Sequence, residues 1–510
     1  MDWLNLPAPE SDRQPAFQDL ASAKLWLGAQ PKAQPLLMQS VLGEQLDALD
    51  AAQLPPALAV ELLNLLHGAI IPVQASLEVR FTRKALPMPN EEERIFAAAQ
   101  KLWTRLGIAY LRLAPHFAPR EKCPLLFRAA NAFRMAQFAH FQASRECPAQ
   151  LDELLFSTLI QAADAGILRQ PHSDSAFRHF GEANIAGLLA WAFLLRLVNP
   201  YHMTAAQLTV ANRTISRWRE LCNFQMDAEH AAPALDIPLA ERFGARLPDS
   251  VPQYLNIQPV VRKIHARVVS LRAGETPESL KLGRELSGTA CIRLLGDIEQ
   301  RLRPPTKTLD RESGQIILAF GAEHAYAVFR EELLNPEAPM DVQSDSLSNQ
   351  RMALFGFDQV ARMPTAVQRL KIPGEPWTLE NGQAIRQPEA GPRRLAPCLI
   401  SANRSERPQL GVLHALLGDA SGTLTAKLEW YSGTVEACRL QQPGLRDTKL
   451  ARVAVFLLNQ DGQMSLVLPN NAPIRPGIGL ALEGSTMHHL VPTEVVERGI
   501  DFVRYACRPG

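Results

Sequence analysis

The sequence has little that would tie it to a metal, a disulfide framework or a nucleic-acid duplex. Its seven cysteines are scattered, odd in number and never arranged as C-x-x-C, so we expect neither a metal site nor disulfides. Lys and Arg number 53 against 52 Asp and Glu, giving a formal net charge of +1. Neither half has the basic excess that duplex DNA or RNA requires. The scattered, unpaired cysteines fit a reducing compartment, and we expect a cytoplasmic protein.

The chain also lacks a long hydrophobic run. Its first residues, Met1–Pro7, have no basic segment followed by an apolar one, so a signal peptide is not expected. The most apolar stretch is Gly187–Val198, which contains Arg196. A membrane span needs about 20 apolar residues, so this stretch predicts a buried helix and no membrane span.

Common catalytic motifs are missing as well. The sequence has no G-x-S-x-G, Walker loop or H-E-x-x-H, and no G-x-G-x-x-G after a strand. His488 and His489 are adjacent but isolated, and we interpret them as a surface pair rather than metal ligands. We therefore expect a non-catalytic protein without a cofactor. An enzyme with an unrecognised site in the helical half remains an alternative.

A length of 510 residues is too great for one hydrophobic core and indicates several domains. Residues 301–321 form a basic, Pro-broken seam between a helical and a β-rich part. The fold class we predict is α+β, with an all-α array followed by an antiparallel β-barrel. The expected boundaries are 1–225 for a helical domain, 226–303 for a connector and helical pair, 304–442 for the barrel and 443–510 for a C-terminal β subdomain.

Apolar residues recur every three or four positions through the first part, as in amphipathic helices. Pro72 should kink or split the helix expected within 55–86, and Asn90 and Thr204 can cap the starts of helices. The expected helices cover roughly 20–27, 55–86, 90–115, 124–143, 148–168, 184–198, 204–221, 257–273 and 279–302. Their similar lengths suit either stacked pairs like tetratricopeptide repeats or an irregular bundle. An array of the first kind commonly binds a protein partner.

Beyond the seam the hydrophobic period changes to two, which is typical of strands. Two hairpins stand out, around the glycine-containing turns at 418–422 and 459–462. The expected strands are 316–320, 325–329, 352–357, 377–379, 410–417, 424–431, 453–458, 464–468, 478–482 and 502–506. Many short strands with glycine turns favour a small barrel.

The seam carries the one cluster of cations that we single out. Arg303, Lys307 and Arg311 could hold a phosphate, since guanidinium groups form paired hydrogen bonds with phosphate or a guanine edge. Alternatively, Asp310 and Glu312 could neutralise them in a solvated hinge.

Several stretches of the second half resemble a known family when taken together. They are W-T-L-E-N at 377–381, P-Q-L-G-V-L-H-A-L-L-G-D-A-S-G at 408–422, L-V-L-P-N-N-A-P-I-R-P-G at 466–477 and V-V-E-R-G-I-D-F-V-R-Y at 495–505. Following a helical region and a basic loop, they resemble the PilZ-domain cyclic-di-GMP receptors of proteobacteria, in the long form. The resemblance implies a PilZ-like barrel and a signalling effector of motility, pili or attachment.

The resemblance also implies a site for cyclic di-GMP. An R-x-x-x-R loop of the family would fall on Lys307 and Arg311, and its [DN]-x-S-x-x-G strand would begin at Asn381. Gln383 and Arg386 stand where that strand has Ser and Gly. An alternative is therefore a helical protein-binding scaffold whose barrel no longer binds the nucleotide.

Arg303 and Arg386 are two further expected ligands of cyclic di-GMP. Arg386 could instead form a different anion site with Arg393 and Arg394.

Overall fold

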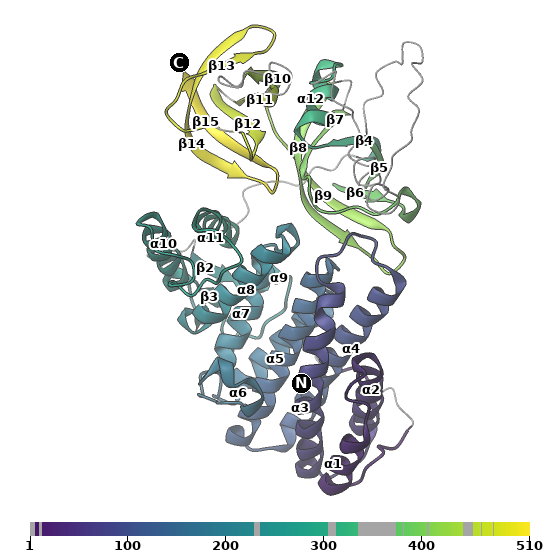
Figure 1. Ribbon diagram of the computed structural model, residues 1–510. Coiled ribbons are helices and arrows are strands. Elements are labelled where there is room, and N and C mark those ends of the chain that lie inside the picture. Colours follow the sequence, from purple (N-terminus) through teal and green to yellow (C-terminus); the bar gives the residue numbers. More distant parts are fainter. Residues whose placement is uncertain are drawn as a thin grey trace. The chain divides into compact units, whose positions relative to one another are not determined.

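The chain folds into two compact units (Figure 1). The helical unit holds the helices before the seam and two short segments, Gly391–Arg393 and Leu417–Leu424; the barrel unit holds the remaining β-rich part. The computed structural model describes residues 6–9, 13–228, 235–303, 313–334, 374–380, 382–404, 407–441, 452–460, 462–472 and 474–510. The α+β class predicted from the sequence is confirmed, with helices first and antiparallel barrels after them.

The helical unit is built from consecutive helices that pack on one another. Its α-helices are α1 (Leu20–Ala29), α2 (Pro35–Ala51), α3 (Pro56–Phe81), α4 (Asn90–Leu113), α5 (Pro119–Ala143), α6 (Ala149–Asp164), α7 (Ile185–Leu197), α8 (Ala205–Trp218), α9 (Leu239–Phe243), α10 (Gln258–Arg272) and α11 (Gly288–Leu302). Each of α2 to α5 packs against the next helix, and α5 also packs against α7. Helix α5 is therefore at the centre of the unit and is buried along most of its length.

A side-chain cap starts α8 at the residue that the sequence predicted, and another starts α7, whereas α4 begins at Asn90 without a side-chain cap bond. Asn184 caps α7 by accepting from the Gly187 amide, and Thr204 forms a capping box with Gln207 at α8. These signals could be read from the sequence because a cap involves residues only three apart.

Two helices differ from the prediction. Helix α3 is not split at Pro72 but continues through it. The residue four positions earlier, Gly68, is exposed, so the carbonyl that loses its helical partner there can meet water. Thr276 starts only a turn, because Lys281 and Gly283 have φ values of 61° and 107°, which end it. Helix α11 starts twelve residues later, after Ser287, whose hydroxyl accepts from the Ala290 amide.

A small sheet interrupts the helices in the segment that we expected to be a connector. Strands β1 (Asn223–Gln225), β2 (Asp236–Pro238) and β3 (Tyr254–Asn256) form it in the order β1-β3-β2, with antiparallel pairing. Asn256 Nδ2 donates to Asp236 Oδ1 at 2.6 Å within it. Three-residue strands give too short an alternation to be recognised in the sequence.

The barrel unit begins with a closed six-stranded barrel in the order β4-β5-β6-β9-β8-β7. Its strands are β4 (Gly314–Phe320), β5 (Glu375–Glu380), β6 (Gln383–Arg386), β7 (Leu399–Arg404), β8 (Arg407–Gly418) and β9 (Leu424–Trp430). The hairpin of β8 and β9 confirms the turn predicted at 418–422. Asp419 Oδ1 accepts from the amides of Ser421 and Thr423 there, and Gly422 has a φ of 86°.

The strand predicted at 325–329 was wrong, because this segment lies in helix α12 (Ala322–Arg330). A short apolar run does not distinguish a strand from a helix. In the helix, Ala325 and Tyr326 are buried, and the Phe329 ring lies 5.7 Å from that of Phe456. The strand predicted at 352–357 lies outside the described residues.

A second closed barrel follows, where the sequence led us to expect only a β subdomain. Its order is β10-β11-β12-β15-β14-β13. The strands are β10 (Thr434–Gln441), β11 (Arg452–Gln460), β12 (Gln463–Pro469), β13 (Leu480–Glu483), β14 (Met487–Arg498) and β15 (Phe502–Pro509). Because β10 pairs with β11 and β13, the second barrel begins at Thr434 and not at the expected residue 443.

Its core is formed by one face of each strand. The buried members of that core are Cys438, Leu440, Val455, Leu457, Leu466, Leu468, Leu482, Leu490, Val503 and Tyr505.

One described helix, α3, is long and apolar enough by length and composition to cross a membrane. Its buried residues, such as Leu62, Leu66 and Ile70, lie within the helical unit, where α3 packs against α2 and α4. A core helix passes the same test, so α3 is weak evidence for a span. Helix α7, expected to be a buried helix, has eleven buried residues of thirteen.

Candidate functional site

Arg303, one of the five residues expected to bind cyclic di-GMP, follows the last residue of α11. Its Nη2 lies 2.7 Å from Oε1 of Glu299, one turn earlier, and its side chain is 51% exposed. Exposed pairs with this spacing contribute only about 0.3–0.5 kcal/mol. Arg303 could therefore exchange this partner for another anion at little cost.

Arg386 lies in a different setting, at the end of β6. Its side chain is 6% exposed, and Nη1 lies 3.2 Å from Oε2 of Glu375 on the neighbouring strand. Its guanidinium also donates to the backbone carbonyl of Ala390, and Cζ lies 5.6 Å from the ring centroid of buried Trp377. Arg386 thus ties β5, β6 and the following turn together inside the first barrel.

The other three expected ligands, Lys307, Arg311 and Asn381, lie outside the described residues. Their roles stay predictions. Gln383, at the position of the family's Ser, is half-buried at the start of β6 and pairs with Glu380. Arg303 belongs to the helical unit and Arg386 to the barrel unit.

The two arginines of the alternative anion site differ in their surroundings. Arg393 is buried, with 9% of its surface exposed, whereas Arg394 is exposed. The backbone of Arg393 pairs with that of Leu86 in the helical unit. An anion site that uses both side chains stays a prediction.

The sequence contains a second Asn-x-Ser pattern, at Asn403-Arg404-Ser405, which was not predicted as part of a site. Asn403 is exposed near the end of β7, where it pairs with Pro408 of β8. Arg404 is buried, and its Cζ lies 4.9 Å from the ring centroid of Trp430 on β9. Stacked arginines of this kind recognise planar anionic groups or fasten neighbouring strands. The spacing of the [DN]-x-S pattern, applied beyond β6, would have found it.

The helical unit contains a buried network of titratable side chains. Arg128 donates to both carboxylate oxygens of Asp174, at 2.7 and 3.1 Å. The Tyr110 hydroxyl donates to Asn64 Oδ1 at 2.9 Å and lies 3.1 Å from His67 Nδ1. The network joins α3, α4 and α5 to the segment that carries Asp174.

Burial strongly affects the ionisation of this network. Desolvation, followed by the positive charge of Arg128, lowers the pKa of His67 to about 3, although Asp174 opposes the shift. His67 is therefore neutral at pH 7. Desolvation raises the pKa of Tyr110 in the same way. Shifted pKa values also occur in catalytic sites. Here His67 and Tyr110 are at most 1% exposed, so the network is better placed to hold the helices together than to meet a substrate.

A second buried cation lies on α5. The Arg134 guanidinium stacks on Trp191 of α7, with Cζ 3.6 Å from the ring centroid, and its Nη2 donates to Asn131 Oδ1 at 2.9 Å. Desolvation, followed by the nearby charge of Arg219, lowers the pKa of Arg134 to about 9. The stack fastens α5 to α7.

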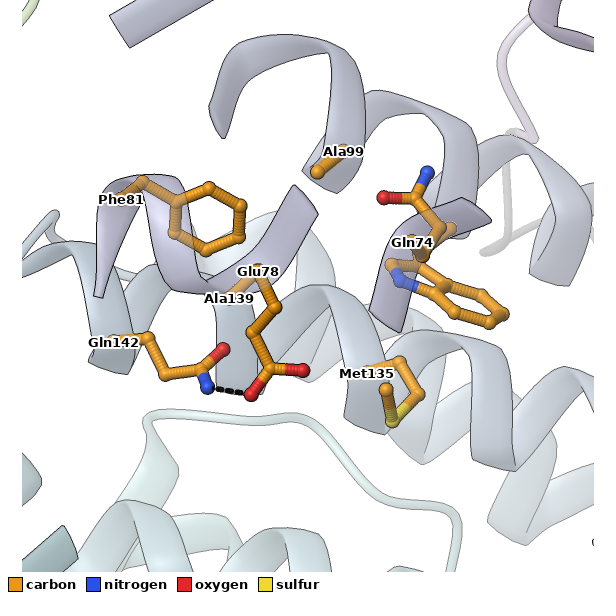
Figure 2. Close-up of a pocket in the computed structure, with 8 residues that line it drawn as sticks. Gln74, Glu78, Phe81, Ala99, Met135, Ala139 and Gln142 are labelled. Atoms are coloured by element: carbon orange, nitrogen blue, oxygen red, sulfur yellow. Dashed lines mark hydrogen bonds between the residues drawn. The ribbon is translucent and has the colours of Figure 1, made fainter. Parts of the chain in front are cut away.

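A small pocket lies among α3, α4 and α5 (Figure 2). It is lined by Gln74, Glu78, Phe81, Ala99, Trp103, Met135, Ala139 and Gln142. The Gln142 amide donates to Glu78 Oε1. A volume of about 10 Å³ holds one water at most, so this pocket is too small for a nucleotide.

Comparison with known proteins concerns the helical unit. Residues 21–230 match a family model described as the N-terminal domain of the cyclic-di-GMP receptor FimW. The match begins within α1 and ends after β1. No curated protein and no solved structure matches the chain. The helical part of this chain is therefore similar to the N-terminal domain of a cyclic-di-GMP receptor.

Proposed function

We propose that this protein is a non-catalytic cytoplasmic effector that binds cyclic di-GMP with a PilZ-like barrel. The observation that carries the proposal is the match of residues 21–230 to the N-terminal domain of a cyclic-di-GMP receptor. The order of domains supports it, since β-barrels follow the helical part. The absence of common catalytic motifs from the sequence supports a role in binding rather than turnover.

The dinucleotide would be held by the cations of the seam and by the first barrel. Lys307 and Arg311 would meet phosphate and guanine, Asn381 would meet a guanine edge, and Arg303 could add a third cation from the end of α11. Two guanidinium or ammonium groups can neutralise the two phosphates of the ligand. The helical half would carry the signal to a protein partner that controls motility, pili or attachment.

Calorimetric titration of the full chain with cyclic di-GMP tests this proposal. We expect saturable heat from the wild type and at least tenfold weaker binding in Lys307→Ala and Arg311→Ala. Arg284→Ala is the matched control, because its side chain is 80% exposed and belongs to the helical unit. Binding that survives both seam substitutions would overturn the site assignment but not the function.

A second candidate function is a helical protein-binding scaffold whose barrel has lost the nucleotide. The observation that favours it is the buried Arg386, which fills a position that is Gly in the family pattern and is paired with Glu375. No heat from the wild type at high ligand concentration would favour this scaffold. Chromatography of the ligand after the titration also tests the enzyme alternative, because a receptor returns cyclic di-GMP unchanged.

A further inference from the structure

One end of the second barrel brings together three side chains that can bind a metal. Glu436 and Cys438 are two residues apart on β10, so their side chains lie on the same face of the strand. Cys438 is fully buried and belongs to the barrel core. Glu436, nearer the end of the strand, keeps 29% of its side chain exposed. The shared face therefore runs from the core to the solvent at this end.

The third side chain, His488, comes from β14. It alternates with His489 and shares a face with Leu490, a member of the same core. His488 Nε2 lies 3.0 Å from Glu436 Oε2, whereas His489 is exposed. The two histidines that look like a pair in the sequence thus face opposite sides of the strand. The ligand atoms of Glu436, Cys438 and His488 all lie within 4.8 Å of one another.

The turn between β13 and β14 closes over this cluster. Both the amide and the hydroxyl of Ser485 donate to Glu436 Oε1 at 2.6 Å, which fixes the carboxylate and leaves Oε2 facing His488. A Cβ on Gly484 would lie 2.4 Å from Glu436 Oε1 and 2.9 Å from Cys438 Sγ. Only glycine lets the turn approach this closely. Hydrogen bonds that orient a carboxylate in this way commonly support metal ligands.

An ion pair between Glu436 and His488 would explain two of these side chains but not the third. It needs no thiol, yet Cys438 Sγ lies within the same 4.8 Å. Thiolate, imidazole and carboxylate form a ligand set that suits zinc, and three protein ligands leave the fourth tetrahedral position to water. Hard cations that prefer oxygen ligands, such as Mg²⁺, would gain nothing from the sulfur atom.

We propose that Glu436, Cys438 and His488 form a zinc site at the end of the second barrel. The Cys438 thiol releases its proton to solvent when its sulfur binds the ion, and Glu436 and His488 bind through Oε2 and Nε2. The ion joins β10 to β14 directly and so fastens the end of the barrel that the turn at Gly484 closes. This inference does not depend on cyclic-di-GMP binding, because it concerns only the second barrel.

Purified full-length protein, stripped of metal with a chelator, is titrated with Co²⁺ as a spectroscopic probe and then with Zn²⁺. We expect one Co²⁺ per chain, a near-ultraviolet charge-transfer band from the thiolate, and visible bands of tetrahedral cobalt that Zn²⁺ abolishes. The thermal unfolding temperature should rise with Zn²⁺. A wild type that shows no thiolate band would overturn the proposal, whatever the variants do.

Matched substitutions locate the ion. Cys438→Ala should abolish the charge-transfer band, and His488→Gln should weaken zinc binding by at least tenfold. His489→Gln and Cys507→Ala are the controls, one on the other face of β14 and one at the second cysteine of this barrel. Equal losses in His488→Gln and His489→Gln would show adventitious binding and overturn the site. Circular dichroism of each variant verifies that it is folded.

Discussion

The Asp501 carboxylate accepts a hydrogen bond from the backbone amide of Cys398, with 2.8 Å between Oδ1 and the nitrogen. Asp501 lies in the turn between β14 and β15, whereas Cys398 immediately precedes β7. The Leu399 amide donates to the same carboxylate at 3.3 Å, and Cys398 Sγ lies 2.9 Å from Oδ1. One carboxylate thus joins the two barrels of the barrel unit at the start of a core strand.

Removing this carboxylate should destabilise the barrel unit. Hydrogen bonds to a charged acceptor contribute about 1.5–3 kcal/mol, so Asp501→Ala should lower the free energy of unfolding by about 2 kcal/mol. Asp501→Asn should cost less, because its amide oxygen still accepts. Urea unfolding followed by circular dichroism measures both, and an alanine variant as stable as the wild type would contradict the stabilising role.

The same substitution should expose a thiol. Desolvation, followed by the negative charge of Asp501, raises the pKa of Cys398 well above its ordinary value, so the buried thiol is unreactive at pH 7. Any loosening of the joint in Asp501→Ala should therefore appear as faster labelling of Cys398 by a thiol reagent, identified by mass spectrometry.

His67 predicts how the stability of the helical unit depends on pH. Its pKa is about 3 in the folded chain and about 6.5 in the unfolded chain, so between these values only the unfolded chain binds the proton. The contribution of neutral His67 to the free energy of unfolding is therefore fully present above pH 6.5. It is lost as the pH falls towards 3, by up to about 1.4 kcal/mol per pH unit.

Urea unfolding of the helical signal between about pH 7 and pH 4.5 measures this slope. His67→Phe keeps an aromatic ring beside Trp103 and Phe177 but cannot titrate, so its stability should fall less steeply with acid. The control is His265→Gln, at a histidine whose side chain is 60% exposed. If His67→Phe had the same slope as the wild type, His67 would not be the titrating group.

The two described candidate ligands should differ sharply in their structural roles. Arg386→Ala removes the ion pair with Glu375, the hydrogen bond to Ala390 and the contact with Trp377, so we expect the barrel unit to lose about 2–3 kcal/mol. Arg303→Ala should cost at most about 0.5 kcal/mol, because its pair with Glu299 is exposed. Chemical unfolding of both variants distinguishes them. If Arg386→Ala binds nucleotide weakly, the fraction of that variant that is folded must be measured before Arg386 is assigned as a ligand.

Local signals were the predictable part of the fold. The cap at Thr204 and the turn at Gly422 depend on residues close in sequence, and both were predicted correctly. Strand β14 was missed because Pro492 and several charged residues interrupt its alternation. Strand β10 pairs with the next strand, β11, but its other partner, β13, lies further along the sequence. A closed second barrel therefore could not be deduced from period alone.

The two candidate sites also differ in how far the sequence predicts them. The seam cations form a cluster in the sequence itself, so they could be named without a structure, although their placement stays a prediction. The cluster of Glu436, Cys438 and His488 exists only because barrel closure brings β10 and β14 to one end, across about fifty residues of chain. No spacing in the sequence marks it, and the adjacent His489 suggests a misleading pair.

Two helical glycines give a test of packing with a built-in control. A Cβ on Gly107 of α4 would lie 2.4 Å from the Phe133 ring of α5, whereas a Cβ on Gly296 of α11 would meet nothing within 4 Å. Alanine is more favourable than glycine inside a helix by about 0.5–1 kcal/mol, so Gly296→Ala should stabilise the helical unit. Gly107→Ala should destabilise it by about 1–3 kcal/mol, because overpacking outweighs the gain in helix propensity. Thermal unfolding of the two variants should thus shift in opposite directions, and a stabilised Gly107→Ala would mean that α4 and α5 are not packed this closely.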